Sequence, residues 1–518
     1  MTQPPPAAGS TSGVRSAGEM DLSAHLADFL STPTPHLLVV AGPPGIGKTS
    51  LLTALRRRLK GPWILMAYRL NPKAATGPAL SENTGPPVSL LMIDPKGSTP
   101  SDAPPGGATR SFSLAFSPSA TQASDDSAPP VVLAALERLT AQGRAYMFVD
   151  VWDRHIETTF DVHPGQGGVV EFVATTRMLR NLLSMLQLHV IFCAPYPLEP
   201  ELQSLADGVV ELGWEDQDGC RIRVASIPNL KWTSLGESRF GFTFSNGEFY
   251  CPPRTSSAFF PPIGPPAPDP EPAEGTLWPG SVDFAQAFGR LRDHSVTAFE
   301  MPAALSQEYM DVIALPVAAH ALLSGGRVMW IPSPQISPSF VCDELVRFVP
   351  RDGVRDRFRI LSATGSDPAL GDLKGVVLPV RMEVGEGNDL HGATAAPTPP
   401  SLLDVYHFLQ QGRPDRPSLF VVSLDGLNAV AAVSGLHLRP ELIPVTLATY
   451  MQLPKFHSLG FGRTGDPFMQ ASLLSAKTHL KFQHRFGRTL IFGARPETPG
   501  YMLEWTDREG RYSLLPMQ

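Results

Sequence analysis

The sequence predicts an α/β protein with two tandem three-layer α/β/α domains, each built on a mainly parallel sheet, the second lacking a phosphate-binding loop. Three observations predict this architecture. An apolar run over 37–41 is followed by a glycine-rich turn and then by leucines at helical spacing, in the order strand, loop and helix. Further short apolar runs alternate with amphipathic stretches, which is typical of a parallel sheet covered on both faces. A similar order of elements recurs after a proline-rich stretch near the middle of the chain.

Composition limits the class of protein. The chain has 518 residues and a formal net charge of -7, which argues against a dedicated nucleic-acid binder with a basic surface. Its four cysteines form no C-x-x-C pair and no metal-ligand spacing. The longest apolar run, 312–323, contains Pro316 and His320 and is too short to span a bilayer. We therefore expect a cytoplasmic protein with reduced thiols, without membrane contact and without nucleic acid as a partner.

The 54 prolines cluster and suggest where domains begin and end. Residues 1–19 are rich in Pro, Ser and Gly and are predicted to be a disordered tail. The first domain is predicted over 20–251, with a flexible surface insertion at 95–129. A proline-rich linker is predicted over 252–280, and the second domain over 281–518.

The turn after the first strand has the residues of a phosphate loop. Gly45 and Gly47 let backbone N–H groups turn toward phosphate oxygens, and the following helix directs its positive end at the same anion. Lys48 is placed to reach the β- and γ-phosphates, and the Thr49 hydroxyl to ligate Mg2+. The candidate nucleotide-binding residues are Gly42, Pro43, Pro44, Gly45, Ile46, Gly47, Lys48, Thr49, Ser50 and Asp150.

Asp150 stands at the end of an apolar strand over 146–149, downstream of the phosphate loop. A carboxylate at such a strand end can hold Mg2+ through water, so the predicted metal residues are Thr49 and Asp150. The alternative is an aspartate that caps the next turn.

The other elements of the first domain follow from periodicity. Leucines and Phe29 at helical spacing predict a helix over 21–31, and similar patterns predict helices over 131–139 and 169–188. Apolar runs predict strands over 63–68, 90–93 and 189–194. The segment 205–212 leads to a turn at 218–219, and 221–227 returns as a strand.

The second block is interpreted as a repeat whose phosphate loop has decayed. The strand over 326–331 and the turn after it are laid on the first motif, which puts Pro338 at the lysine position. A proline has neither charge nor N–H donor. The run 419–424 ending at Asp425 is matched to the strand before Asp150, and 489–494 to 189–194.

Several pieces together resemble the RecA superfamily and, within it, the KaiC and RadA-like ATPases. The segments LADGVVEL and RIRVASIPNLKWTS resemble that family's closing strands, where a Lys-x-Arg pair reaches the neighbouring subunit's γ-phosphate. Here Asn229 stands at the Lys position and Lys231 at the Arg position. The resemblance implies two tandem RecA-like domains. It also implies that the first of them binds ATP with Mg2+.

More specifically, FLSTPTPHLLVVAGPPGIGKTSLL, the D-x-W-D of 150–153 and GGRVMWIPSPQISPSF are similar to the archaeal gas-vesicle protein D (GvpD) type of P-loop protein. That resemblance covers most of 20–350. It implies a regulator that controls a transcriptional activator through protein contact, with a protein partner or self-association.

One departure from KaiC-like proteins concerns hydrolysis. In them the second strand ends in a glutamate pair that activates water, whereas here Arg69 and Leu70 follow the run 63–68. Candidate substitutes are Asp94 and Asp153, with Arg69 as a candidate phosphate sensor. We therefore predict ATP binding with slow or absent turnover.

Two alternatives stay open at the level of sequence. An active ATPase of the RecA and RadA type, acting on DNA or a protein assembly, would use Lys231 across a subunit boundary. The stretch 477–488 interleaves cations with Phe482 and Phe486, which suits either nucleic-acid contact or a solvated strand face.

Overall fold

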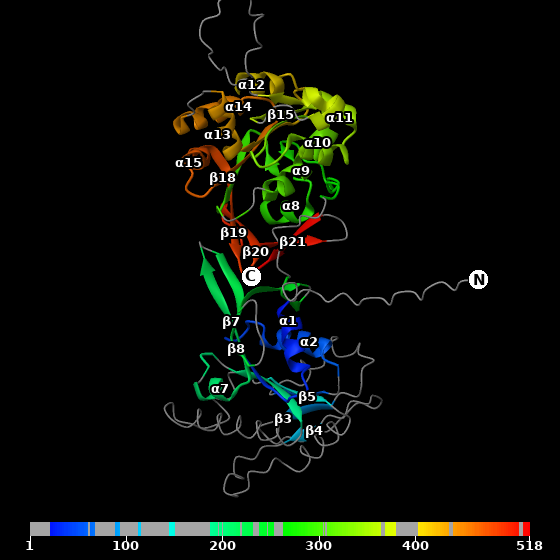
Figure 1. The fold of residues 1–518 in the computed structure, drawn as a ribbon, viewed down its shortest axis with the longest axis vertical. Helices are drawn as coiled ribbons and strands as arrows, with labels where there is room; N and C mark the ends of the chain where they lie inside the picture. Colours follow the sequence, from blue (N-terminus) through cyan, green and yellow to red (C-terminus); the bar gives the residue numbers. More distant parts are fainter. Residues whose placement is uncertain are drawn as a thin grey trace, which may run out of the picture. The chain divides into compact units, whose positions relative to one another are not determined.

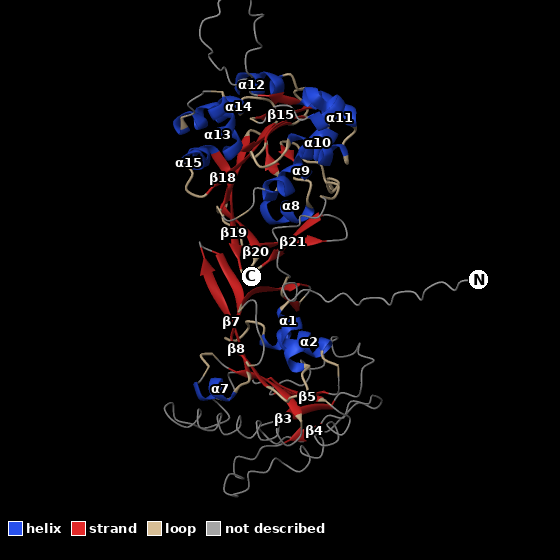
Figure 2. Cartoon of the chain, viewed as in Figure 1, coloured by secondary structure: helices blue, strands red, loops and turns tan. Residues whose placement is uncertain are grey.

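A computed structural model describes residues 21–60, 63–67, 89–93, 112–114, 144–150, 187–194, 196–198, 200–217, 220–231, 238–245, 247–252, 263–303, 305, 308–363, 368–379, 402–434, 439–506 and 511–517. The chain divides into two compact units, the first of residues 1–217 and 222–254 and the second of residues 255–518 together with 218–221. Figure 1 shows the elements of each unit, and Figure 2 shows that both combine helices with strands.

The described helices of unit one are α1 (Leu22–Leu30), α2 (Lys48–Arg58) and α7 (Pro200–Leu205). Its strands are β1 (Leu37–Ala41), β2 (Trp63–Ala67), β3 (Ser89–Ile93), β4 (Phe112–Leu114), β5 (Ala145–Asp150), β6 (Leu188–Ala194), β7 (Gly208–Gln217), β8 (Cys220–Leu230), β9 (Arg239–Ser245) and β10 (Glu248–Tyr250).

These strands form one ten-stranded sheet in the order β10-β9-β8-β7-β1-β6-β5-β2-β3-β4. The pairings from β7 to β4 are parallel, whereas β8, β9 and β10 continue the sheet as antiparallel strands. Strand β1 is central, and β6 separates it from β5. In such sheets the loops after parallel strands gather at one edge, where ligands bind.

Helices α1 and α2 cover one face of this sheet. Asp21 caps α1 by accepting a hydrogen bond from the N–H of Ala24, as expected for an N-cap aspartate. Leu51 and Leu55 of α2 are fully buried in a cluster with Leu38 and Val40 of β1. Burial of these side chains holds the start of α2 against the end of β1, and therefore fixes the intervening loop.

The described helices of unit two are α8 (Val282–Phe288), α9 (Glu308–Leu323), α10 (Pro338–Val346), α11 (Arg351–Arg357), α12 (Leu402–Gln410), α13 (Leu424–Val433), α14 (Ile443–Tyr450) and α15 (Pro467–Ser475), with 3-10 segments η3 (Pro368–Val376) and η4 (Pro440–Leu442). Its strands are β11 (Thr276–Leu277), β12 (Leu291–Arg292), β13 (Ser295–Met301), β14 (Arg327–Ile331), β15 (Phe358–Ser362), β16 (Val377–Pro379), β17 (Ser418–Ser423), β18 (Phe456–Arg463), β19 (Ala476–Arg485), β20 (Arg488–Arg495), β21 (Tyr501–Thr506) and β22 (Arg511–Pro516).

Unit two has helices on both faces of its sheet. Along β14, Val328 and Trp330 join a buried cluster with α9, α10 and α11. The alternate residues Met329 and Ile331 join a second cluster with helices α12 to α15. Figure 1 shows these two groups of helices on opposite sides of the strands. A strand that is apolar on both faces is the pattern of a buried parallel sheet.

The two sheets have the same strand order. Unit two runs β22-β21-β20-β19-β13-β18-β17-β14-β15-β16, so each strand of unit one has a counterpart at the same place in the sheet and in the chain. The antiparallel end also recurs, in the pairs β19–β20, β20–β21 and β21–β22. The order of elements therefore repeats, as the sequence predicted, although the residue matches differ.

Two matches predicted from the sequence are wrong. The counterpart of β1 is β13, not the strand over 326–331, which is β14 and corresponds to β2. The run 489–494 lies in antiparallel β20, whereas the counterpart of β6 is β18. The length and apolar character of a strand do not determine which strands it pairs with. Matching the two halves of the sequence on these features therefore gave the wrong counterparts for β1 and β6. The match of β17 to β5 is consistent with the strand order.

The proline-rich stretch predicted as a linker is partly folded. Ile263 and Leu277 belong to the core of unit two, and the indole Nε1 of Trp278 donates a hydrogen bond to the carbonyl of Ala267 at 2.9 Å. Arg290 pairs with Asp269 and lies over the Trp278 ring. Residues 263–280 are therefore packed structure, unlike the predicted linker over 252–280.

Most other predicted elements of unit one are confirmed within a few residues at each end. The predicted insertion over 95–129 contains β4, which extends the sheet beside β3. The predicted tail over 1–19 and the predicted helices over 131–139 and 169–188 lie outside the described residues. None of the described helices is long and apolar enough to cross a membrane.

Candidate functional site

The loop between β1 and α2 lies at the edge of the sheet where the parallel strands end. Gly45 has φ 75° and Gly47 has φ 118°, in the region that glycine adopts without strain. A Cβ added at Gly42 would lie 2.7 Å from the backbone oxygen of Leu212, so only glycine fits there. Ile46 is fully buried beneath the loop. The loop thus requires glycine at three of the predicted positions, at 45 and 47 because of positive φ and at 42 because of the close contact.

Lys48 begins α2 and is buried, with 8% of its surface exposed. Its Nζ donates hydrogen bonds to the backbone oxygens of Gly42 and, at 3.3 Å, of Pro43. The ammonium group therefore lies within the loop, held by carbonyl oxygens.

The N-terminus of α2 faces the same place. Gly47 is its N-cap residue and supplies no side-chain hydrogen bond. The first N–H groups of a helix have no intrahelical partner, and the helix dipole makes them attractive to an anion. The arrangement of Lys48 and these N–H groups suits phosphate oxygens.

The predicted metal residues are in direct contact. The Thr49 hydroxyl donates a hydrogen bond of 2.9 Å to Oδ2 of Asp150. Asp150 is the last residue of β5 and is 6% exposed, opposite Ala67 at the end of β2. A hydroxyl and a carboxylate at this spacing provide the hard oxygen ligands that Mg2+ prefers.

An aromatic group that the sequence reasoning missed lies on the other side of the loop. Phe244 of β9 approaches Gly47: a Cβ at Gly47 would be 2.5 Å from Cζ of Phe244. The guanidinium of Arg223 lies 4.5 Å from the ring centres of both Trp214 and Phe244. Burial lowers the pKa of Arg223 from its ordinary value. The sequence gives no signal for this group, because the three residues come from three different strands.

The remaining candidates of unit one are placed as follows. Lys231 forms an ion pair of 3.3 Å with Asp207, which also accepts the backbone N–H of Leu37 at 3.0 Å. Lys231 is thus paired within its own chain. Asp94, Asp153 and Arg69 lie outside the described residues. Over the described part of the chain, no three His, Cys, Asp or Glu residues gather as a metal site.

The equivalent edge of unit two has different chemistry. The segment after β13, Met301-Pro302-Ala303-Ala304-Leu305-Ser306-Gln307, contains neither glycine nor lysine. Arg463 at the end of β18 donates from Nη1 to the carbonyl of Ala303 at 3.3 Å, and its Nε lies 2.9 Å from Asp425. An arginine and an aspartate therefore tie together the ends of the strands that correspond to β1, β6 and β5.

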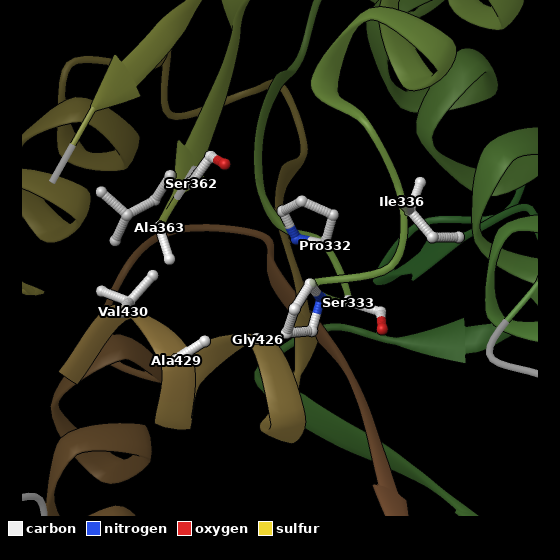
Figure 3. A pocket seen from close by; sticks show the side chains of 10 residues that line it. Pro332, Ser333, Ile336, Ser362, Ala363, Gly426, Ala429 and Val430 are labelled. Carbon is white, nitrogen blue, oxygen red and sulfur yellow. The ribbon is translucent and has the colours of Figure 1, made fainter. Parts of the chain in front are cut away.

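The turn after β14, matched to the phosphate loop from sequence, borders a small hollow. Figure 3 shows Pro332 and Ser333 opposite Ala363, Gly426, Ala429 and Val430. Among the described residues, no charged side chain lines this hollow. Ser337 caps α10 by accepting the N–H of Phe340 at 3.2 Å. This turn provides no cation for phosphate.

The stretch 477–488 forms β19 and the start of β20. Phe482 is 3% exposed and belongs to the core, so its ring is not open to a nucleobase. Leu480 is buried on the same face, whereas Lys477 and Arg485 are exposed. This alternation of buried and exposed residues fits the second alternative for the stretch, a solvated strand face.

No protein-family model matches the chain, and no curated protein matches it significantly.

Proposed function

We propose that the protein binds ATP with Mg2+ at the β1–α2 loop of unit one and acts as a regulator of the RecA and KaiC type. One observation carries the nucleotide part of the proposal. The Thr49 hydroxyl and the Asp150 carboxylate meet beside a loop whose glycines, lysine and helix N-terminus converge on the same space. Each group has a part in holding a triphosphate and its metal ion.

The binding chemistry follows from these groups. The N–H groups at the start of α2 and the Lys48 ammonium neutralise β- and γ-phosphate oxygens. Lys48, now bonded to the carbonyl oxygens of Gly42 and Pro43, would be the side chain that meets the phosphate oxygens. Thr49 and Asp150 would hold the Mg2+ ion, the hydroxyl as a direct ligand and the carboxylate through water.

The fold supports tandem domains of one kind. Both sheets have the same strand order, and unit two has helices on both faces. We propose that both are RecA-like, and that unit two has kept the architecture without a phosphate site. Its loop after β13 has no glycine or lysine.

We further propose that hydrolysis is slow or absent. Binding needs the loop and the metal, whereas hydrolysis also needs a group that orients the attacking water. The strand over 63–67 ends in Ala67, with no carboxylate in the residues that follow directly. Asp94 and Asp153 stay candidates for that role, and Arg69 stays a candidate phosphate sensor. Such a site suits a cytoplasmic switch whose ATP-bound form contacts a protein partner or another copy of the chain. By resemblance, we propose that this contact controls gas-vesicle-type gene expression.

An active ATPase that acts on DNA or on a protein assembly is the alternative. It requires a cation that reaches a neighbouring subunit, and Lys231 is engaged by Asp207 of its own chain. This ion pair favours the regulator.

The test is titration of the purified full-length protein with Mg-ATP, followed by a turnover assay. Lys48→Ala is expected to weaken ATP binding by at least about a hundredfold, since it removes a charge-assisted contact inside a buried loop. Lys60→Ala is the matched control, because Lys60 is exposed beyond the end of α2. Equal ATP affinity of the Lys48 variant and the wild type would refute nucleotide binding at this loop, and rapid turnover would refute the slow-hydrolysis proposal.

A further inference from the structure

Three side chains form a stack beside the phosphate loop. Arg223 of β8 lies between Trp214 of β7 and Phe244 of β9, with its guanidinium carbon 4.5 Å from each ring centre. A guanidinium at this distance from an aromatic face is attracted by the ring's negative potential. The three residues therefore act as one structural group, held by neighbouring strands of the antiparallel end of the sheet.

This stack is next to the loop, on the flank away from the metal residues. The Phe244 ring packs against Gly47, and the backbone of Leu212 on β7 packs against Gly42. Thr49 instead turns toward Asp150 on β5, which lies on the other side of β1 in the sheet order. The loop thus has a metal flank toward β5 and an aromatic flank toward β7, β8 and β9.

The two flanks define a direction for a bound triphosphate. A Mg2+ ion held by Thr49 and Asp150 would neutralise the terminal phosphates, so the metal flank would take that end of the triphosphate. The other end, which carries the ribose and base, must leave the loop on the opposite flank. We infer that Trp214, Arg223 and Phe244 bind the nucleoside part of the nucleotide; this inference rests on the proposed function.

The hydrogen-bonding state of Arg223 supports this role. Its Nε and Nη1 are buried and, among the described residues, find no hydrogen-bond acceptor. A buried donor without an acceptor is unfavourable, so the site is incomplete in this respect. Ribose oxygens and the acceptor nitrogens and oxygens of a base are groups that can complete it, and every base has a face that stacks on an aromatic ring.

The test separates nucleoside from phosphate recognition. Binding of Mg-ATP and of inorganic triphosphate with Mg2+ is measured for the full-length wild type, Arg223→Ala and Arg239→Ala. Arg239 is the matched control, because it lies on β9, as Phe244 does, and forms an exposed ion pair with Glu215 of β7. Arg223→Ala is expected to lower ATP affinity about tenfold, equivalent to about 1.4 kcal/mol. It is expected to leave triphosphate affinity within about twofold of wild type, and Arg239→Ala to change neither.

Each of the other possible outcomes overturns either the nucleoside-binding role of the three residues or the proposed function. Equal weakening of ATP and triphosphate by Arg223→Ala would mean that the stack only supports the loop, and unchanged ATP affinity would mean that it does not contact the nucleoside. If the wild type binds neither ligand, the proposed function fails and the inference with it. If Arg223→Ala does not fold, Arg223→Lys and Phe244→Leu give the same comparison, and their binding of triphosphate reports an intact loop.

Discussion

The hydroxyl of Thr49 donates a hydrogen bond of 2.9 Å to the carboxylate of Asp150, across 101 residues of sequence. One residue lies in the first turn of a helix and the other ends a strand, and the parallel order β1-β6-β5 brings them to the same edge. Two side-chain oxygens of the kind that Mg2+ prefers are thereby brought together. The first prediction depends on this contact.

Thr49→Val and Asp150→Asn are expected to reduce the gain in ATP affinity that Mg2+ provides. Each variant removes one oxygen ligand or its charge while nearly keeping the shape, and the loss is expected to be roughly tenfold or more. The measurement is ATP titration with Mg2+ and with a chelator. Thr53→Val is the control, because the Thr53 hydroxyl lies one turn along α2 and donates to the carbonyl of Thr49. A Mg2+ effect that survives in both site variants would place the metal elsewhere.

Two glycines of the loop are expected to respond differently to substitution. Both have positive φ, but a Cβ at Gly45 meets nothing within 4 Å, whereas one at Gly47 meets the Phe244 ring at 2.5 Å. Gly45→Ala is expected to lower the free energy of unfolding by about 1 kcal/mol through backbone strain. Gly47→Ala is expected to lower it by more than about 2 kcal/mol and to abolish ATP binding. Unfolding in urea checks the difference, and equal destabilisation by the two would contradict it.

Local sequence patterns were sufficient for strands β1, β2, β3, β5, β6 and β8, for the loop after β1 and for the meeting of Thr49 with Asp150. Each depends on neighbours in the chain or on one topological rule, that parallel strands end at one edge. The Arg223 stack depends on the pairing of three strands, and no spacing encodes it. The match of unit two failed for the same reason, since β13 and β14 are both short apolar strands and only the sheet order distinguishes them. The proline content of 263–280 suggested a linker, although Trp278 and Ile263 anchor it.

Acid is expected to destabilise unit one through His189. Burial, with smaller contributions from His36 and Arg144, lowers the pKa of His189 to about 4. The unfolded chain binds this proton near pH 6.5, so between pH 6.5 and 4 the unfolded state holds more protons and stability falls as the pH falls. The expected loss between pH 7.5 and pH 5 is about 2 kcal/mol.

His189→Phe should remove the His189 contribution to this pH dependence while keeping the ring beside Tyr146, and the exposed His407→Phe should not. Burial also lowers the pKa of His36 and of His320, so a smaller dependence of the same sign is expected to remain in His189→Phe. The pKa of Glu300 is lowered by its hydrogen bond with His479 and that of Asp293 by its hydrogen bond with His457, so both carboxylates titrate below this window. Urea unfolding at the two pH values measures the difference. An unchanged pH dependence in His189→Phe would assign the effect to other groups.

The protein is expected to bind one nucleotide per chain, although it contains two sheets of the same strand order. The loop after β13 has no glycine to turn its N–H groups inward and no lysine to meet a phosphate. In its place Arg463 joins the carbonyl of Ala303 to the carboxylate of Asp425, at the strand ends that correspond to those of Gly42 and Asp150. Calorimetric titration with Mg-ATP should give a stoichiometry of one, which Lys48→Ala abolishes and Arg463→Ala leaves unchanged. A stoichiometry of two, or a second binding event that appears in Arg463→Ala, would show that unit two retains a site which the arginine only covers.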